Sequence, residues 1–160
     1  KPQIALAKEY GLKDYSQPAG GCCFLTDESY SAKLVDLWKA RGTKDYELDD
    51  VMLLKVGRHI RPNQDFKIIV AREDGEGRFL QGYKKNYINM TCESHRGPLA
   101  LIDGDPSAED LHIAAQIVAR YGQGKDAEQV EVSVRDLAGN ESTLQVKPFG
   151  VDEIPKEWFV

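Results

Sequence analysis

The chain has few of the residues that build disulfide scaffolds, and it lacks the long apolar runs of membrane proteins. Its 160 residues include only three Cys, two Met and two Trp. No apolar stretch approaches the roughly 18 residues that a membrane-spanning helix needs, and no signal-peptide pattern is present. Three cysteines, two of them adjacent, do not form the framework of a secreted domain. We therefore expect a cytoplasmic protein with no membrane partner.

Several signatures of common chemistry are also missing. The glycines within residues 75–82 do not match the dinucleotide-binding fingerprint, and no Gly-Lys-Ser/Thr phosphate loop occurs. The three histidines lack the spacing of metal ligands, and the cysteines form no paired CxxC elements. The sequence therefore predicts no metal site and no cofactor bound by this chain itself.

The net charge of −5 conceals a basic middle section. Residues 55–96 carry nine Lys or Arg against five Asp or Glu, a balance of +4, so the remainder carries −9. A local phosphate-binding face is one interpretation of this asymmetry. A solvated surface whose cations pair with nearby acids is the other.

The hydrophobic pattern predicts an α+β fold, a mostly antiparallel sheet with two or three packed helices, preceded by a small helical appendage. The polar stretch 43–50 predicts a linker between an appendage over residues 1–42 and a main domain over 51–160. Since the chain starts without Met and inside an expected helix, we expect a fragment of a longer protein. Helices are expected over 2–10, from Asp27 or Ser29 to Lys39, over 76–85 and over 107–121. Strands are expected near 56–61, 66–71, 87–92, 98–102, 130–135 and 142–147, with the first two joined as a hairpin.

Two of the three cysteines, Cys22 and Cys23, lie on a glycine turn between two expected helices. Glycines allow close approach of a large partner, and the N-terminus of the following helix would favour a thiolate. These two thiols are therefore the candidate catalytic residues. A buried structural pair is the alternative, because a free Cys is among the most buried residue types. Cys92 stands alone on an expected strand and is predicted to lie in the core.

Candidate RNA-binding residues come from the basic section. If residues 56–61 form a strand, its alternation places Arg58 and Ile60 on one face, and His59 and Arg61 on the other. The hairpin can present cations to a phosphate backbone, and the loop at 95–97 offers a ring and a guanidinium that can stack on a nucleotide. Pairing of the arginines with nearby acids is the alternative. The candidates are Arg58, His59, Arg61, Lys67, Arg72, His95 and Arg96.

Residues 18–25, Pro-Ala-Gly-Gly-Cys-Cys-Phe-Leu, are similar to the motif Ser-Thr-Gly-Ile-Cys-Phe-Ile-Gly of the tRNA 2-thiouridylase family. The alignment places the sulfur-carrying cysteine of that family at Cys23, and Cys22 stands where the family has an apolar residue. The resemblance covers about the first 40 residues. It implies a parent protein that uses ATP to transfer sulfur to tRNA, with a sulfur-donor protein as a further partner. Because the nucleotide-binding loop of that family is missing here, this chain alone is not expected to be an active enzyme.

Beyond residue 50 the chain resembles the RNA-binding module of the NFACT protein family. The matching segments are 56–59, 67–72, 95–100 and 114–121. This resemblance implies that the chain binds tRNA or another structured RNA, as the C-terminal part of a tRNA-modification enzyme. A thiol redox carrier that uses Cys22 and Cys23 and a plain interaction domain remain the alternative functions. RNA binding with a steep salt dependence would separate the first interpretation from the other two.

Overall fold

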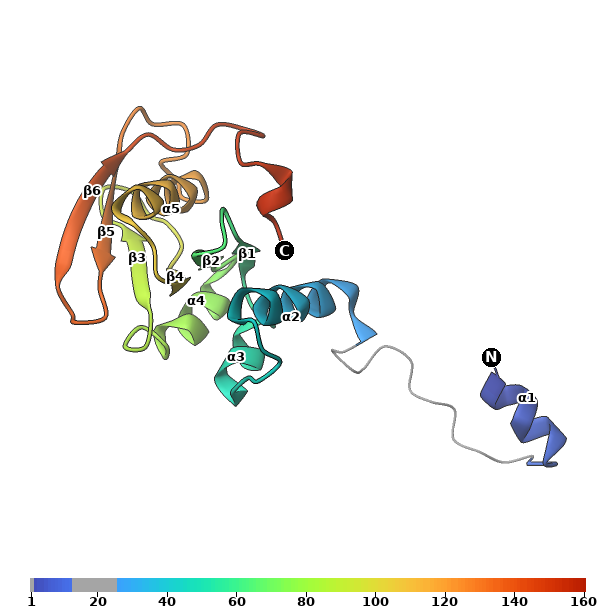
Figure 1. The fold of residues 1–160 in the computed structure, drawn as a ribbon. Helices are drawn as coiled ribbons and strands as arrows, with labels where there is room; N and C mark the ends of the chain where they lie inside the picture. Colours follow the sequence, from blue (N-terminus) through green and yellow to red (C-terminus); the bar gives the residue numbers. More distant parts are fainter. Residues whose placement is uncertain (1, 13–25) are drawn as a thin grey trace.

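A six-stranded antiparallel sheet forms the centre of the fold, with the strand order β1-β2-β4-β3-β5-β6. The computed structural model describes residues 2–12 and 26–160 (Figure 1). The strands are β1 (Arg58–Ile60), β2 (Phe66–Val70), β3 (Ile88–Cys92), β4 (Ala100–Gly104), β5 (Val130–Arg135) and β6 (Glu141–Val146). The helices are α1 (Pro2–Glu9), α2 (Glu28–Arg41), α3 (Leu48–Leu53), α4 (Asp74–Gln81), α5 (Ala108–Arg120) and the 3₁₀ helix η2 (Lys156–Trp158). The predicted α+β class with an antiparallel sheet is confirmed, whereas Cys22 and Cys23 lie outside the described residues.

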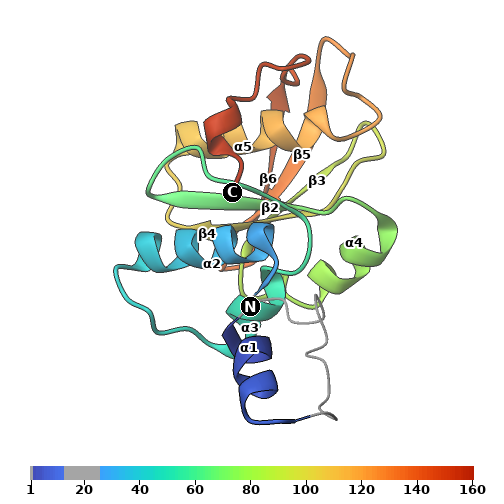
Figure 2. The same cartoon turned by 90° about the vertical axis from the view of Figure 1, so that its right-hand side faces the viewer.

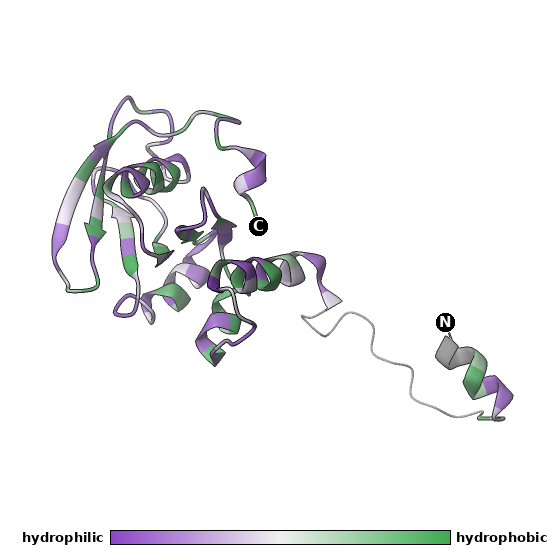
Figure 3. Cartoon of the chain, viewed as in Figure 1, coloured by the Kyte–Doolittle hydropathy of each residue, from purple (hydrophilic) through white to green (hydrophobic). Residues whose placement is uncertain are grey.

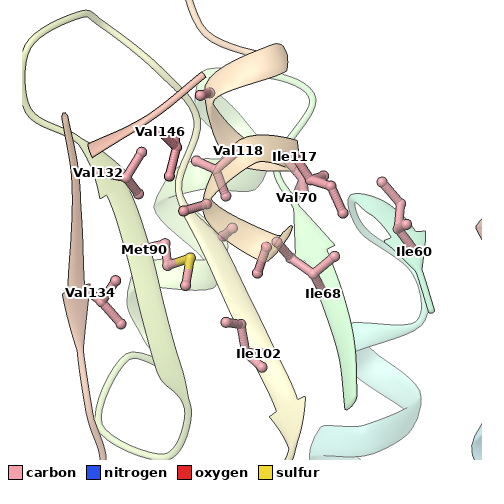
Figure 4. Packing of buried hydrophobic residues seen from close by; sticks show 14 of the residues in the cluster. Ile60, Ile68, Val70, Met90, Ile102, Ile117, Val118, Val132, Val134 and Val146 are labelled. Atoms are coloured by element: carbon pink, nitrogen blue, oxygen red, sulfur yellow. The ribbon is translucent and has the colours of Figure 1, made fainter. Parts of the chain in front are cut away.

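Helices cover both faces of the sheet near β2 (Figure 2). Helix α5 packs on one face, where Ile117 and Val118 meet Ile68 and Val70 of β2 in the main core (Figure 4). Helices α3 and α4 pack on the other face, where a second cluster includes Ile69. Since both faces are covered, every residue of β2 is buried. Hydrophobic residues accordingly gather in α5 and in the strands beneath it (Figure 3).

Capping residues determine where the helices begin and end. The Asp27 side chain accepts a hydrogen bond of 2.8 Å from the Tyr30 backbone N–H at the start of α2. Gly42, with φ of 67°, ends that helix in the left-handed conformation. At α5, Ser107 forms a capping box with Asp110. Both helices occur where the sequence predicts them.

Helix α4 begins earlier than the pattern predicts, at Asp74 rather than at residue 76, and ends at Gln81 rather than at 85. Glycines at 75 and 77 lower the helix propensity of its first turn, which hides the start of the helix from a pattern based on propensity. A pair of acids at 74 and 76 favours a helix N-terminus there. The turns at 82–86 then lead into β3.

Ion pairs bind helix α2 to the sheet. The Asp36 carboxylate accepts a 2.9 Å hydrogen bond from the Arg61 guanidinium and a 3.3 Å hydrogen bond from the Lys67 ammonium. The Lys33 ammonium donates to the Leu54 carbonyl at 3.4 Å. Helix α3 begins inside the predicted linker at 43–50. The division into two domains at residues 43–50 stays a prediction. Helix α2, which precedes these residues in the sequence, is nevertheless held to the sheet by its ion pairs.

The C-terminal residues close the outer edge of β1. The Arg61 N–H donates to the Trp158 carbonyl at 2.7 Å, and the Val160 N–H donates to the His59 carbonyl at 3.1 Å. Within residues 2–12 and 26–160, no helix has the length and apolar character needed to cross a membrane.

Candidate nucleic-acid interface

A basic cleft of about 890 Å³ opens between helix α4, the loop from β3 to β4, and the C-terminal end of α5. Its lining includes six Lys or Arg residues and two acids, Glu73 and Asp74. The excess of positive charge makes the cleft attractive to an anionic ligand such as a phosphate backbone. Its cations are Arg58, Arg72, Arg78, Arg96, Arg120 and Lys125.

Arg58 is positioned by an aromatic ring. Its guanidinium lies over the Tyr121 ring, 4.5 Å from the ring centroid, which is within the range of a cation–π interaction. Arg58 lies on β1, and Tyr121 follows the last residue of α5. Burial raises the pKa of Tyr121, although Arg58 and Arg120 act in the opposite direction. The contact therefore joins the edge of the sheet to the end of the helix at one side of the cleft.

Arg72 is positioned by a buried carboxylate. Glu76 accepts a 2.7 Å hydrogen bond from the Arg72 backbone N–H and a 3.0 Å hydrogen bond from its guanidinium Nε. Burial raises the pKa of Glu76, but the Arg72 side chain and the backbone N–H groups of Arg72 and Gly57 outweigh it and lower the pKa to about 2. Glu76 is therefore ionised at neutral pH, and it holds Arg72 with half of its side chain exposed, at 50%.

The loop from β3 to β4 and the turn after α5 pack closely together and line one side of the cleft. A Cβ added at Gly97 would lie 2.7 Å from the Cys92 Sγ, so a side chain at this position would collide with the thiol. The Gln123 N–H donates to the Arg96 carbonyl at 2.8 Å and joins the two loops. The Arg96 side chain is left 71% exposed, 3.3 Å from the Asp74 carboxylate across the cleft.

Residues 57–159 match the family described as the NFACT protein RNA binding domain. The chain belongs to this family. No curated protein matches the sequence. The C-terminal part of the fibronectin/fibrinogen-binding protein from Streptococcus suis has a similar structure, with a TM-score of 0.54 and 18% identity, over 66% of this chain and 49% of that one. This chain thus spans about half the length of that structure, and the likeness shows the fold alone.

Three of the predicted RNA-binding residues of this NFACT domain lie outside the cleft. His59 and Lys67 are 2% and 1% exposed, and Arg61 is bound to Asp36. Strand alternation directs them to the face opposite Arg58, and helices α2 and α3 cover that face. In this fold these three side chains are buried or paired with Asp36, so they do not contribute to the surface of the cleft, and their assignment to RNA binding stays a prediction.

The remaining predicted residues divide into two groups. Arg58, Arg72 and Arg96 meet in the cleft of the NFACT domain. His95 is half-buried beside it, with its Nδ1 2.9 Å from the Ser94 Oγ. A Cβ at Gly124 would lie 2.8 Å from the His95 ring, so His95 packs over that glycine and supports the loop.

Sequence reasoning missed three cleft cations: Arg78, Arg120 and Lys125. Arg78 belongs to the basic section 55–96, and Arg120 is the basic residue in the last turn of the helix predicted over 107–121, so each could have been singled out from the sequence. Lys125 lies in the turn after α5 and had none. Among the described residues, no group of three His, Cys, Asp or Glu side chains could hold a metal ion.

Cys92 is half-buried at the end of β3 and packs against the main core. Burial, and next the charge of Glu93, raises the pKa of its thiol to about 11. A thiol with this pKa is protonated at neutral pH, and its position agrees with the core role that the sequence predicts.

Proposed function

We propose that this NFACT domain binds structured RNA, with tRNA as the expected partner, through the basic cleft between α4 and the end of α5. The observation that carries the proposal is the convergence of six cations on one cleft that holds only two acids. Neutralising phosphates with arginines and lysines releases condensed counterions, which drives RNA binding at low salt.

The arginines in the cleft differ in how they are held. Arg72 is fixed by Glu76, and Arg58 by Tyr121. A guanidinium that is already ordered loses less side-chain entropy on binding, so these two suit the recognition of a phosphate in a fixed place. Arg96 is exposed and can adapt to the path of the strand. The combination favours recognition by backbone shape and charge, which is how proteins recognise folded RNA helices.

The test is tRNA binding by the full chain at several salt concentrations. The double variant Arg72→Ala/Arg96→Ala should bind a fluorescently labelled tRNA transcript more weakly. The slope of log affinity against log salt should fall by about 0.9 for each phosphate that the variant no longer neutralises. Arg135→Ala is the matched control, because Arg135 is also exposed and paired, with Glu141, but lies outside the cleft. An equal weakening in Arg135→Ala, or unchanged binding by the double variant, would place the site elsewhere.

Sulfur transfer by the parent protein is a second hypothesis, which rests on the sequence around Cys22 and Cys23. This hypothesis implies that the parent protein uses ATP as its cofactor, receives sulfur from a donor protein and is located in the cytoplasm. In the full-length parent, Cys23→Ser should abolish sulfur transfer and leave tRNA binding intact, because a hydroxyl cannot carry a persulfide. Mass-spectrometric mapping under turnover tests this hypothesis. A persulfide on neither cysteine would leave RNA binding as the only function proposed for this chain.

A further inference from the structure

Helix α4 presents a glycine, Gly77, to the basic cleft. A Cβ added at Gly77 would meet no atom within 4 Å. The backbone there is helical and lies outside the left-handed region that favours glycine. Neither packing within the chain nor backbone conformation therefore requires a glycine at this position.

The other cleft glycines have reasons within the chain. At Gly97 a Cβ would lie 2.7 Å from the Cys92 Sγ, and at Gly122 it would lie 3.3 Å from the Arg96 carbonyl oxygen. Gly77 has no such neighbour, and a glycine inside a helix is less favourable than an alanine. A glycine that the fold does not require, and that lines a basic cleft, leaves room for another molecule to approach the backbone closely.

We propose that Gly77 is the point at which the RNA backbone makes its closest approach to the protein. This inference rests on the proposed function of the cleft. Gly77 lies next to Arg78 in the sequence and shares the cleft with Arg72 and Arg96. A strand whose phosphates engage these arginines passes over the helix surface at Gly77, where the missing side chain leaves room for a ribose–phosphate unit in direct contact.

The inference predicts opposite effects of one methyl group on stability and on binding. Gly77→Ala should raise the thermal unfolding temperature of the full chain by about 3 °C, because alanine favours the helix. The same variant should bind the tRNA transcript about tenfold more weakly. The salt slope should stay unchanged, because the substitution removes no charge. Gly77→Gln, with a longer side chain, should weaken binding further.

Gly75→Ala is the matched control on the same helix. Gly75 does not line the cleft, and its added Cβ would make only an ordinary contact, 3.7 Å from the Glu73 carboxylate. The Gly75→Ala variant should be stabilised to a similar extent as Gly77→Ala, and it should bind tRNA with wild-type affinity. Equal weakening in both variants would indicate an effect of helix stiffness and overturn the inference.

The outcomes also separate this inference from the proposed function. Wild-type binding by Gly77→Ala, together with weak binding by Arg72→Ala/Arg96→Ala, would overturn the role of Gly77 and leave the cleft in place. Wild-type binding by all of these variants would overturn both. Weak binding by Gly77→Ala with an unchanged salt slope and a raised unfolding temperature would support both.

Discussion

Mild acid should destabilise this domain because of one buried histidine, His59. Its Nε2 lies 3.2 Å from the Leu53 carbonyl and 3.0 Å from the Val56 carbonyl, so the neutral ring donates from this nitrogen. Its Nδ1 is buried and has no hydrogen-bond partner among the described residues. Burial, and then the charges of Lys67 and Lys33, lower the pKa of His59 from 6.5 to about 3.

The size and sign of the effect follow from this shift. Between pH 6.5 and 3, the unfolded chain binds a proton at His59 that the folded protein does not bind, so stability falls as the pH falls. Well below pH 6.5 each pH unit costs about 1.4 kcal/mol, and the total loss at pH 5 relative to alkaline pH is about 2 kcal/mol. That is a large share of the roughly 5–15 kcal/mol that stabilises a typical domain. Carboxylates such as Glu76, whose pKa is lowered to about 2 from 4.5, lose their stabilising contribution at lower pH.

Urea unfolding at pH 6.5 and pH 5.0, followed by tryptophan fluorescence, measures this change in stability. His59→Gln is the control, because an amide of similar shape can donate to the same carbonyls but does not titrate. The free energy of unfolding of the wild type should fall by about 1.6 kcal/mol more than that of this variant between the two pH values, since the unfolded histidine is already half protonated at pH 6.5. Equal decreases in the two proteins would refute the argument that burial holds His59 neutral.

Three further substitutions test the structure. Asp36→Ala should lower the free energy of unfolding by about 3–5 kcal/mol in urea titrations, because it leaves two cations unpaired beneath α2. Gly104→Ala should cost at least about 2 kcal/mol in the same assay, since φ is 119° and the new Cβ would lie 2.1 Å from the Asp65 carbonyl oxygen. Asp74→Ala should cost at most about 1 kcal/mol of stability, because it removes an acid from the first turn of α4. It should tighten tRNA binding about threefold at low salt, because it removes an exposed acid beside Arg96; weaker binding would contradict the proposed path of the RNA.

Local chemistry was sufficient to predict most elements of the fold. Alternating residues predicted the strands, and the capping residues Asp27 and Ser107 predicted where two helices begin. These signals are legible in the sequence because they act between residues that are near one another along the chain. Helix α4 was displaced in the prediction because the glycines in its first turn weaken the local preference.

The cleft could be predicted only in part. Alternation correctly separated Arg58 from His59 and Arg61, but it could not say which face would stay open. Helix α2 packs against the face that carries Arg61 and Lys67, where its Asp36 pairs with both side chains, so this face is covered. A basic residue looks the same in the sequence whether it reaches solvent or a buried carboxylate.

The sequence by itself determined the α+β class, the strand pairing of the first hairpin and the resemblance to an RNA-binding family. The tertiary structure decided which cations share a surface, because Arg78, Arg96 and Arg120 lie on three separate elements that meet only in the folded chain. It also decided the state of His59, whose pKa is lowered by burial and by the charges of Lys67 on β2 and Lys33 on α2. Charge and hydrophobic pattern are properties of the chain, whereas exposure and electrostatic environment arise only when its segments pack together.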